Sequence, residues 1–413
     1  MRKLKVLHTA DWHLGRNLKD IQRESEFIDV LNQLYQYLER EQPDLILLAG
    51  DIFDSSLPSI WAQRLYYDFC SRVSRLAFTP AVVITGGNHD SALLLDAPQQ
   101  LLSSFNIYVI GGSYLDINKE VIPVDNQEGE RIAIVLAVPY LRDSQLKRAR
   151  RASEVESWSE QLHDAMRLHY QEVIAQGLAL RGDANIPLIA MGHLFMQGGV
   201  INEHDGTRPP VGTLGAFAAD TTFDAIDYLA LGHLHQPQMV GGREHWRYSG
   251  SLLKSAFSET GHEKSLTLIS FEGKKIETIE LLPLQSPIPL IRLTGTFEEQ
   301  ELAIARLEKE STNVYVEMQV SERFLTPASM FQSHLKEKSS PVMILQLTRL
   351  QKMAALDIMN HLPQKGISLA QITPIELFKE RLLVAQLEDS ALEHKLEKLF
   401  LQLEKELLEQ ERE

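Results

Sequence analysis

The segment Leu4-Lys-Val-Leu-His-Thr-Ala-Asp-Trp-His13 joins a short apolar run, residues 4–9, to the polar triplet Asp11-Trp12-His13. Similar runs, rich in residues that favour strands, recur along the N-terminal part of the chain. The other runs span residues 45–49, 81–85, 132–138, 188–191 and 228–231. Apolar residues at helical spacing separate the first three runs, and this alternation of strand and helix is typical of an α/β domain.

Three prolines within residues 282–290 predict a domain boundary, because proline disfavours continued regular structure. We therefore place a first domain at residues 1–284. Residues 285–372 alternate again between strand-like runs and a helical pattern, which predicts a small α+β capping domain. Residues 373–413 are predicted to form a C-terminal helical segment, since residues 376–413 contain no glycine or proline. An apolar stripe at helical spacing runs along this segment and consists of Leu392, Leu396, Leu399, Leu403 and Leu407.

The chain is acidic, with 41 basic and 56 acidic side chains among 413 residues and a net charge of −15. This argues against tight unaided binding of DNA, because neutralising phosphates supplies most of that affinity. Residues 142–151 are an exception, with five basic residues and one acidic residue. A DNA contact and a solvated basic helix start are equally good interpretations of them. The single cysteine, Cys70, and the lack of an apolar signal or membrane-spanning run predict a cytoplasmic protein.

Five of the apolar runs end in side chains that can bind metal. Loops at the carboxyl ends of strands are where open α/β sheets place their sites. Imidazole, carboxylate and amide oxygen together suit a transition metal, and a central carboxylate such as Asp51 could bridge two ions roughly 3.5–4 Å apart. In Asp-x-His and His-x-His, an extended backbone would point both side chains to one side. The five clusters are Asp11-Trp-His13, Gly50-Asp51-Ile-Phe-Asp54, Gly86-Gly-Asn88-His89-Asp90, Gly192-His193 and Gly232-His233-Leu-His235.

Each cluster alone is a weak signal, since an isolated Asp-x-His or His-x-His arises often by chance. Asn, His and Asp together are poor strand formers, so Gly-Asn-His-Asp is more specific. Five clusters in this order, each at the end of an apolar run, favour a metal site over a structural role. Trp12, between two candidate ligands, is predicted to pack under the site.

The order of these clusters resembles that of the calcineurin-like metallophosphoesterase superfamily. The sequence around these clusters is similar to that of the SbcD family, the nuclease subunits of bacterial SbcCD complexes. The resemblance implies a four-layer α/β/β/α sandwich with a capping domain. One departure is Leu252, where such sequences commonly carry proline, and it affects only the local turn. The stretches that carry the likeness are Leu7-His-Thr-Ala-Asp-Trp-His-Leu-Gly15, Ala49-Gly-Asp-Ile-Phe-Asp54, Leu229-Ala-Leu-Gly-His-Leu-His235 and Tyr248-Ser-Gly-Ser251.

The resemblance implies two divalent ions, with Mn²⁺ as the preferred metal and Mg²⁺ as the alternative. By this likeness, the first ion would be held by Asp11, His13, Asp51 and His235. The second would be held by Asp51, Asn88, His193 and His233. His89 is left as a catalytic residue that contacts the scissile phosphate and protonates the leaving oxygen. Asp54 would orient His89, with Asp90 as the less favoured candidate for that role.

The same resemblance implies a DNA nuclease that acts as a 3'–5' exonuclease on double strands and as an endonuclease on single strands and hairpins. Its expected roles are DNA repair, recombination, replication and the processing of DNA ends. It implies a homodimer and an SbcC-type SMC-like ATPase that binds the C-terminal helical segment, although that segment could also pack on its own domain. The alternative function is a metallophosphatase for a small phosphoester, which has no need of a capping domain. A metal-free scaffold ranks last because no matched ligand is lost.

Overall fold

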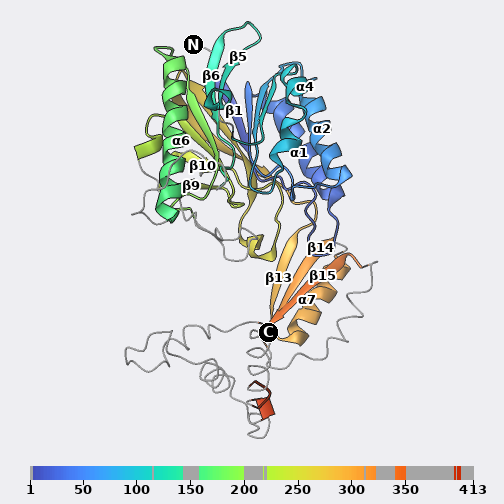
Figure 1. The fold of residues 1–413 in the computed structure, drawn as a ribbon. Coiled ribbons are helices and arrows are strands. Elements are labelled where there is room, and N and C mark those ends of the chain that lie inside the picture. Colours follow the sequence, from blue (N-terminus) through green and yellow to red (C-terminus); the bar gives the residue numbers. More distant parts are fainter. Residues whose placement is uncertain are drawn as a thin grey trace.

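A computed structural model of the protein describes residues 3–113, 116–142, 158–199, 217, 221–310, 313–321, 340–349, 395, 396 and 398–400. The described strands form two six-stranded sheets and one three-stranded sheet. The two large sheets stack face to face, and helices cover the outer face of each (Figure 1). The predicted α/β/β/α sandwich is therefore confirmed.

The first large sheet has the strand order β12-β11-β1-β2-β3-β4. Its strands β1 to β4 are parallel, and the hairpin β11–β12 adds two antiparallel strands beside β1. Helices α1 and α2 cover its outer face. These elements are β1 (Lys3–Thr9), α1 (Glu24–Glu41), β2 (Leu45–Ala49), α2 (Ile60–Val73), β3 (Ala81–Thr85), α3 (Ala92–Asp96), α4 (Gln99–Ser103), β4 (Ile107–Ile110), β11 (Lys264–Glu272) and β12 (Lys275–Leu284).

The second large sheet has the strand order β5-β6-β7-β8-β10-β9. Its inner strands are parallel, and the two edge strands β5 and β9 are antiparallel to their neighbours. Helix α6 packs on its outer face. The elements are η1 (Ile117–Glu120), β5 (Val121–Asp125), β6 (Arg131–Ala137), α6 (Trp158–Arg181), β7 (Leu188–His193), η3 (Thr221–Phe223), β8 (Tyr228–Gly232), β9 (Gln238–Val240), β10 (Arg243–Tyr248) and η4 (Phe257–Gly261).

Strand β2 shows why the apolar runs could be recognised in the sequence. Leu45 and Leu47 point into the layer between the two sheets, whereas Ile46 and Leu48 pack against the helices. All four side chains are fully buried. A strand buried on both faces reads as a continuous apolar run, because alternation between apolar and polar residues has no role there. The six predicted runs all form strands of the two large sheets.

The described part of the predicted capping domain is a parallel sheet, β13-β14-β15, with one helix packed on it. The helix α7 begins at a capping box, in which the Thr296 side chain and the Glu299 side chain each bind the other's backbone N–H. A small apolar cluster that includes Phe257 and Leu290 joins this domain to the first one. The elements are β13 (Leu290–Gly295), α7 (Phe297–Lys309), β14 (Val314–Val320) and β15 (Val342–Arg349).

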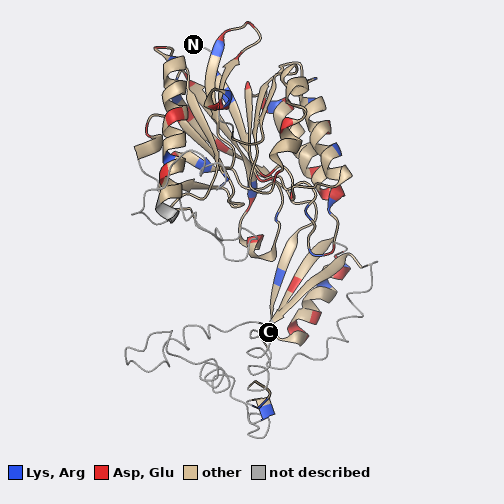
Figure 2. Cartoon of the chain, viewed as in Figure 1, with Lys and Arg blue, Asp and Glu red and all other residues tan. Residues whose placement is uncertain are grey.

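The predicted C-terminal helical segment lies outside the described residues, apart from residues 395, 396 and 398–400, which are helical. Within this short helix the Leu399 side chain is 54% exposed. Basic and acidic residues are interspersed over the sandwich and the capping domain (Figure 2). Of the helices that the structure describes, none has the length and apolar character needed to cross a membrane.

Leu47→Ala should lower the free energy of unfolding by about 2–5 kcal/mol, because it opens a cavity between the two sheets. The matched control is Leu281→Ala, on a β12 side chain that is 48% exposed, which should change stability by no more than about 0.5 kcal/mol. Urea denaturation followed by circular dichroism measures both. Equal destabilisation by the two variants would contradict the packing described here.

Candidate metal centre

The seven predicted metal ligands lie on one edge of the sandwich, in or beside loops that follow strands of both large sheets. This edge is the one that faces the capping domain (Figure 1). The carboxyl ends of strands from the two sheets thus meet along one seam. Asp11 and His13 follow β1, Asp51 follows β2, Asn88 follows β3, His193 ends β7, and His233 and His235 follow β8.

The seam forms because two glycines allow the strand ends to approach closely. A Cβ atom at Gly232 would lie 1.8 Å from the carbonyl oxygen of Ala49, and one at Gly50 would lie 2.1 Å from Nδ1 of His193. Both distances are far below van der Waals contact, so a larger residue would displace the Ala49 backbone at Gly232 and the His193 ring at Gly50. Gly50 also has a φ of +82°, which favours glycine.

The backbone at four of the ligands is left-handed. Asp11, His13, Asp51 and His233 have φ values of 51°, 47°, 49° and 103°. The prediction that Asp-x-His and His-x-His are extended segments is therefore wrong, because Asp11, His13 and His233 all have positive φ values. Hydrogen bonds between the loops hold this conformation instead, because the N–H of Asp11 donates to Gly50 O at 3.0 Å and the N–H of His13 donates to Asp51 O at 2.9 Å. Such backbone strain costs about 1–3 kcal/mol per residue and is typical of functional sites.

The first group of ligands brings two imidazoles together. Nε2 of His13 lies 3.0 Å from Nε2 of His235 and 3.6 Å from Oδ2 of Asp51. Ligand atoms of Asp11, His13 and His235 all lie within 4.8 Å of one another. Burial lowers the pKa of His13 to about 4, so this imidazole is neutral at pH 7 and has a lone pair to share.

The second group converges on the side-chain oxygen of Asn88. Its Oδ1 lies 3.0 Å from Nε2 of His193 and 3.1 Å from Nδ1 of His233. Nε2 of His193 is also 3.3 Å from Oδ2 of Asp51. The other ring nitrogen of His193 donates a hydrogen bond to Ala49 O at 3.0 Å, so Nε2 is the atom presented to the site.

Burial and mutual charge dominate the electrostatics of the site. Burial raises the pKa of Asp11 to about 6 and lowers that of His233 to about 3. Burial alone would also lower the pKa of His193, but the carboxylates of Asp51 and Asp11 raise it to about 9. Burial opposes ionisation of Asp51 as well, yet His193 and His13 hold its pKa well below the usual range. The site therefore contains buried anionic oxygen atoms that require a positive partner.

These residues fit divalent metal ions. The Nε2 atoms of His13 and His235 face each other, while Nδ1 of His13 lies 3.4 Å from Oδ1 of Asp54 and Nδ1 of His235 lies 3.3 Å from Oγ of Ser255. Two converging lone pairs repel each other unless a cation or a proton lies between them. The chemistry of the donors, imidazole with carboxylate and amide oxygen, suits a transition metal. The clustering of these Asp and His side chains supports the binding of divalent metal.

His89 lies beside these ligands and is held by Asp54, although not through its carboxylate. Nδ1 of His89 donates to the main-chain carbonyl oxygen of Asp54 at 2.8 Å. The Asp54 carboxylate contacts His13 and Arg16 instead, at 3.4 and 3.5 Å. The His89 ring is partly exposed, and its centroid is 4.9 Å from that of His13. With Nδ1 occupied, Nε2 is the nitrogen of His89 that can exchange a proton with a substrate.

Asp90 has a structural contribution that the sequence did not reveal. Its buried carboxylate accepts backbone N–H groups of Ile52, Phe53 and Gly87 at 3.1, 2.9 and 2.8 Å. It thereby joins the loop after β2 to the loop after β3. Burial raises the pKa of Asp90 to about 6. The motif Gly-Asn-His-Asp marks Asp90 in the sequence, but it does not indicate which backbone N–H groups the Asp90 carboxylate accepts.

Three further residues, Ser255, Glu259 and Lys264, lie behind His235 and were missed by sequence reasoning. Oγ of Ser255 is 3.3 Å from Nδ1 of His235, and the buried Glu259 carboxylate forms an ion pair with Lys264 at 2.6 Å. No motif marks them, because they approach His235 from a segment that begins 20 residues further along the chain. The environment of His235 is therefore a product of the fold rather than of local sequence.

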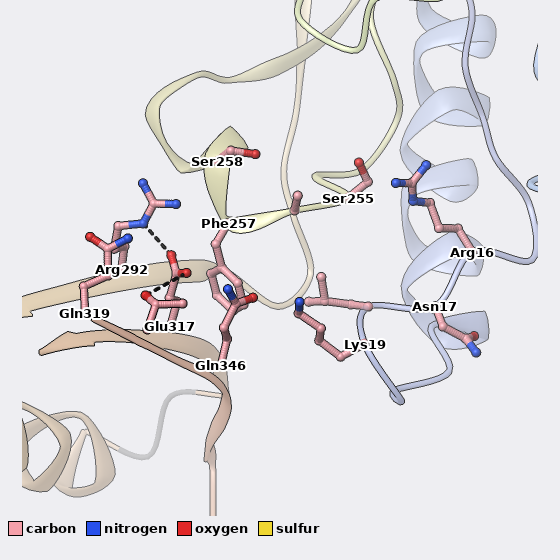
Figure 3. Close-up of a pocket in the computed structure, with 13 residues that line it drawn as sticks. Arg16, Asn17, Lys19, Ser255, Phe257, Ser258, Arg292, Glu317, Gln319 and Gln346 are labelled. Atoms are coloured by element: carbon pink, nitrogen blue, oxygen red, sulfur yellow. Dashed lines mark hydrogen bonds and ion pairs between the residues drawn. The ribbon is translucent and has the colours of Figure 1, made fainter. Parts of the chain in front are cut away.

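A pocket of about 880 Å³ adjoins the site and separates it from the capping domain (Figure 3). It is polar and contains more basic than acidic side chains. Arg16 and Lys19 lie on one side, whereas Arg292 on the other side is paired with Glu317. From the basic stretch at residues 142–151 only Arg142 is described, and it donates to Asp90 O at 2.8 Å. A DNA contact by this stretch stays a prediction.

Comparison with known proteins gives consistent results. A family model described as calcineurin-like phosphoesterase matches residues 4–237. The SbcD subunit of the nuclease SbcCD from Rhodobacter capsulatus is 36% identical over 296 residues, which cover 70% of this chain and 71% of that protein. The SbcD protein from Bacillus subtilis is 32% identical, with 82% and 84% of the two chains covered. The one from Escherichia coli K12 is 29% identical, with 96% and 97% covered.

Asp51→Asn should weaken both metal sites, because the Asp51 carboxylate contacts His13 on one side and His193 on the other. Loss of this ligand should cost more than the roughly 10–100-fold in affinity that the loss of an outer contact costs. Calorimetric titration of the metal-free protein with Mn²⁺ measures both sites. Asp224→Asn, at an exposed position, serves as the control and should leave both affinities unchanged. Unaltered binding by Asp51→Asn would remove Asp51 from the metal centre.

Proposed function

Because this chain belongs to the calcineurin-like phosphoesterase family and, within it, to the SbcD family of nuclease subunits, we propose that it hydrolyses phosphodiester bonds of DNA together with SbcC. It is a metal-dependent hydrolase of the nuclease class. The observation that carries this proposal is the convergence of imidazole, carboxylate and amide donors from both sheets on one seam. A small-phosphoester metallophosphatase is the weaker alternative.

The proposed ligand sets are those implied by the family. Asp11, His13, Asp51 and His235 would hold one ion. Asp51, Asn88, His193 and His233 would hold the other. We propose Mn²⁺ as the physiological metal, with Mg²⁺ as the alternative. When bound, such ions supply Lewis acidity at the phosphoryl group and lower the pKa of coordinated water.

The chain's own residues contribute proton transfer and orientation. We assign His89 as the general acid that protonates the leaving oxygen, because it lies beside the ligands with Nε2 available. The Asp54 carbonyl keeps the His89 proton on Nδ1 in the neutral ring, so the second, transferable proton is the one on Nε2. We therefore propose that Asp54 orients His89 through its main-chain carbonyl oxygen rather than through its carboxylate. Its carboxylate instead lies 3.4 Å from Nδ1 of His13.

The pocket beside the site supports a polymeric substrate. Its volume, about 880 Å³, is bounded by both domains, and Arg16 and Lys19 supply positive charge to it, whereas Arg292 is paired with Glu317. A phosphodiester backbone matches a polar, cationic cleft of this kind, whereas a small phosphoester would leave most of it empty. Cleavage of double strands from 3' ends and of single strands and hairpins remains a proposal drawn from the family.

The assembly is also a proposal. An acidic protein with a net charge of −15 needs a partner that supplies most of the DNA-binding surface, and an SbcC-type SMC-like ATPase would do so. We propose that this ATPase binds the C-terminal helical segment, residues 373–413, and that the nuclease domains, residues 1–284, form a homodimer. Residues 285–372 would complete the chain as the capping domain. The free, buried Cys70 is compatible with a cytoplasmic location.

His89→Ala should slow Mn²⁺-dependent cleavage of linear duplex DNA by about 10²–10⁴-fold, since that is the usual contribution of a general acid. The affinity for Mn²⁺ should stay unchanged because His89 is not among the proposed ligands. His163→Ala, on helix α6, which packs on the outer face of the second sheet, is the control and should cleave at the normal rate. A normal rate for His89→Ala would remove its assignment. Faster turnover of a chromogenic phosphate ester than of DNA would favour the alternative function.

Leu399→Glu should abolish co-purification with the ATPase, because it places a charge on the apolar stripe of the C-terminal helical segment, where Leu399 is 54% exposed. Lys398→Glu is a matched control one residue away and outside the stripe, and it should bind the ATPase normally. Size-exclusion chromatography of the mixed subunits measures both. Equal binding by the two variants would show that the stripe does not contact the ATPase.

A further inference from the structure

A chain of buried polar contacts lies behind His235, on the side of the ring that faces away from the site. Nδ1 of His235 is 3.3 Å from Oγ of Ser255 and 3.6 Å from Oε1 of Glu259. The Ser255 hydroxyl donates to Oε1 of Glu259. The side chain of Lys264 forms an ion pair with Oε2 of Glu259 at 2.6 Å and donates to the His235 carbonyl oxygen at 2.7 Å. His235, Glu259 and Lys264 are all buried.

The directions of these hydrogen bonds determine the tautomer of His235. The Ser255 hydroxyl has one proton, which it gives to Glu259, so its oxygen can only accept from the imidazole. Nδ1 of His235 therefore carries the proton in the neutral ring, and the lone pair lies on Nε2. That atom is the one that lies 3.0 Å from Nε2 of His13.

We propose that Glu259 is a positioning residue for His235, acting through Ser255, and that it strengthens binding of the ion held by His13 and His235. This inference rests on the proposed function in one respect, namely that His235 holds a metal. A carboxylate behind a ligating imidazole fixes the ring orientation and makes the nitrogen ligand more basic. Lys264 balances the buried charge of Glu259 and at the same time holds the main chain of His235.

The chain offers a matched pair that separates this role from mere stability. Glu120 is another fully buried glutamate paired with a histidine, since its Oε2 lies 2.7 Å from Nε2 of His169. It belongs to η1, which packs against α6 on the outer face of the second sheet, and it is not among the residues that approach the metal ligands. Substitution of Glu120 therefore disturbs a buried His–Glu pair and leaves the metal centre alone.

The experiment compares Glu259→Gln, Ser255→Ala and Glu120→Gln with the unmodified chain. Each metal-free protein is titrated with Mn²⁺ by calorimetry and with Co²⁺ by visible absorption, and its unfolding is followed by circular dichroism. Glu259→Gln should weaken one of the two sites by about 10–100-fold, change the Co²⁺ spectrum of that site and leave the other unchanged. Ser255→Ala should weaken the same site. Glu120→Gln should leave both sites and the spectrum unchanged, whatever its effect on unfolding.

The outcomes are distinguishable. Equal metal affinities for Glu259→Gln and the unmodified chain would overturn the inference while leaving the proposed function intact. Absence of Mn²⁺ and Co²⁺ binding by the unmodified chain would overturn both. If Glu259→Gln does not fold, Ser255→Ala decides, because it keeps the Glu259–Lys264 ion pair. Unchanged metal affinity in Ser255→Ala would then refute the relay from Glu259 to His235.

Discussion

The site depends on how closely the ends of β2 and β8 approach each other. The carbonyl oxygen of Ala49 lies where any side chain at Gly232 would have to be, and it also accepts the Nδ1 proton of His193. Two sheets that each end in an ordinary loop would leave their polar residues apart. Here the contact between strand ends fixes the distance between donors from the first sheet and donors from the second. The metal centre therefore exists only in the assembled sandwich.

The apolar runs and the clusters after them were sufficient to predict an α/β domain and the identity of the clustered residues, whereas the sandwich was predicted from the resemblance to a known family. Strands such as β2 and β3 are buried on both faces, so their apolar runs are unbroken, and the ligand-type residues come directly after them. The backbone conformation of the loops that carry the ligands could not be predicted from the sequence. Asp11 and His13 looked extended, yet hydrogen bonds to Gly50 and Asp51, some forty residues away in the chain, hold them left-handed. Asp54 was identified, but not that its carbonyl oxygen contacts His89.

The layer behind the ligands was also beyond prediction. Glu259 is one of 56 acidic residues, and nothing around it in the sequence sets it apart. Its importance comes from its burial beside Lys264 and from its approach to His235, which only the fold brings about. The net charge gave a similarly incomplete picture. A total of −15 averages over the whole chain, whereas the lining of the pocket beside the site has three basic side chains and one acidic one, Glu317.

The apolar cluster that joins the two domains has a consequence for the metal centre. Phe257 stands between Ser255 and Glu259 in the chain, and it packs with Leu290 and Tyr315 of the capping domain. A displacement of that domain that carries Phe257 with it also shifts the residues that support His235. Thermodynamic linkage makes such a coupling reciprocal: if the position of the capping domain changes the affinity for the metal ion, metal binding must change the preferred position of that domain by the same free energy. The occupancy of the metal site and the position of the capping domain would then be coupled equilibria.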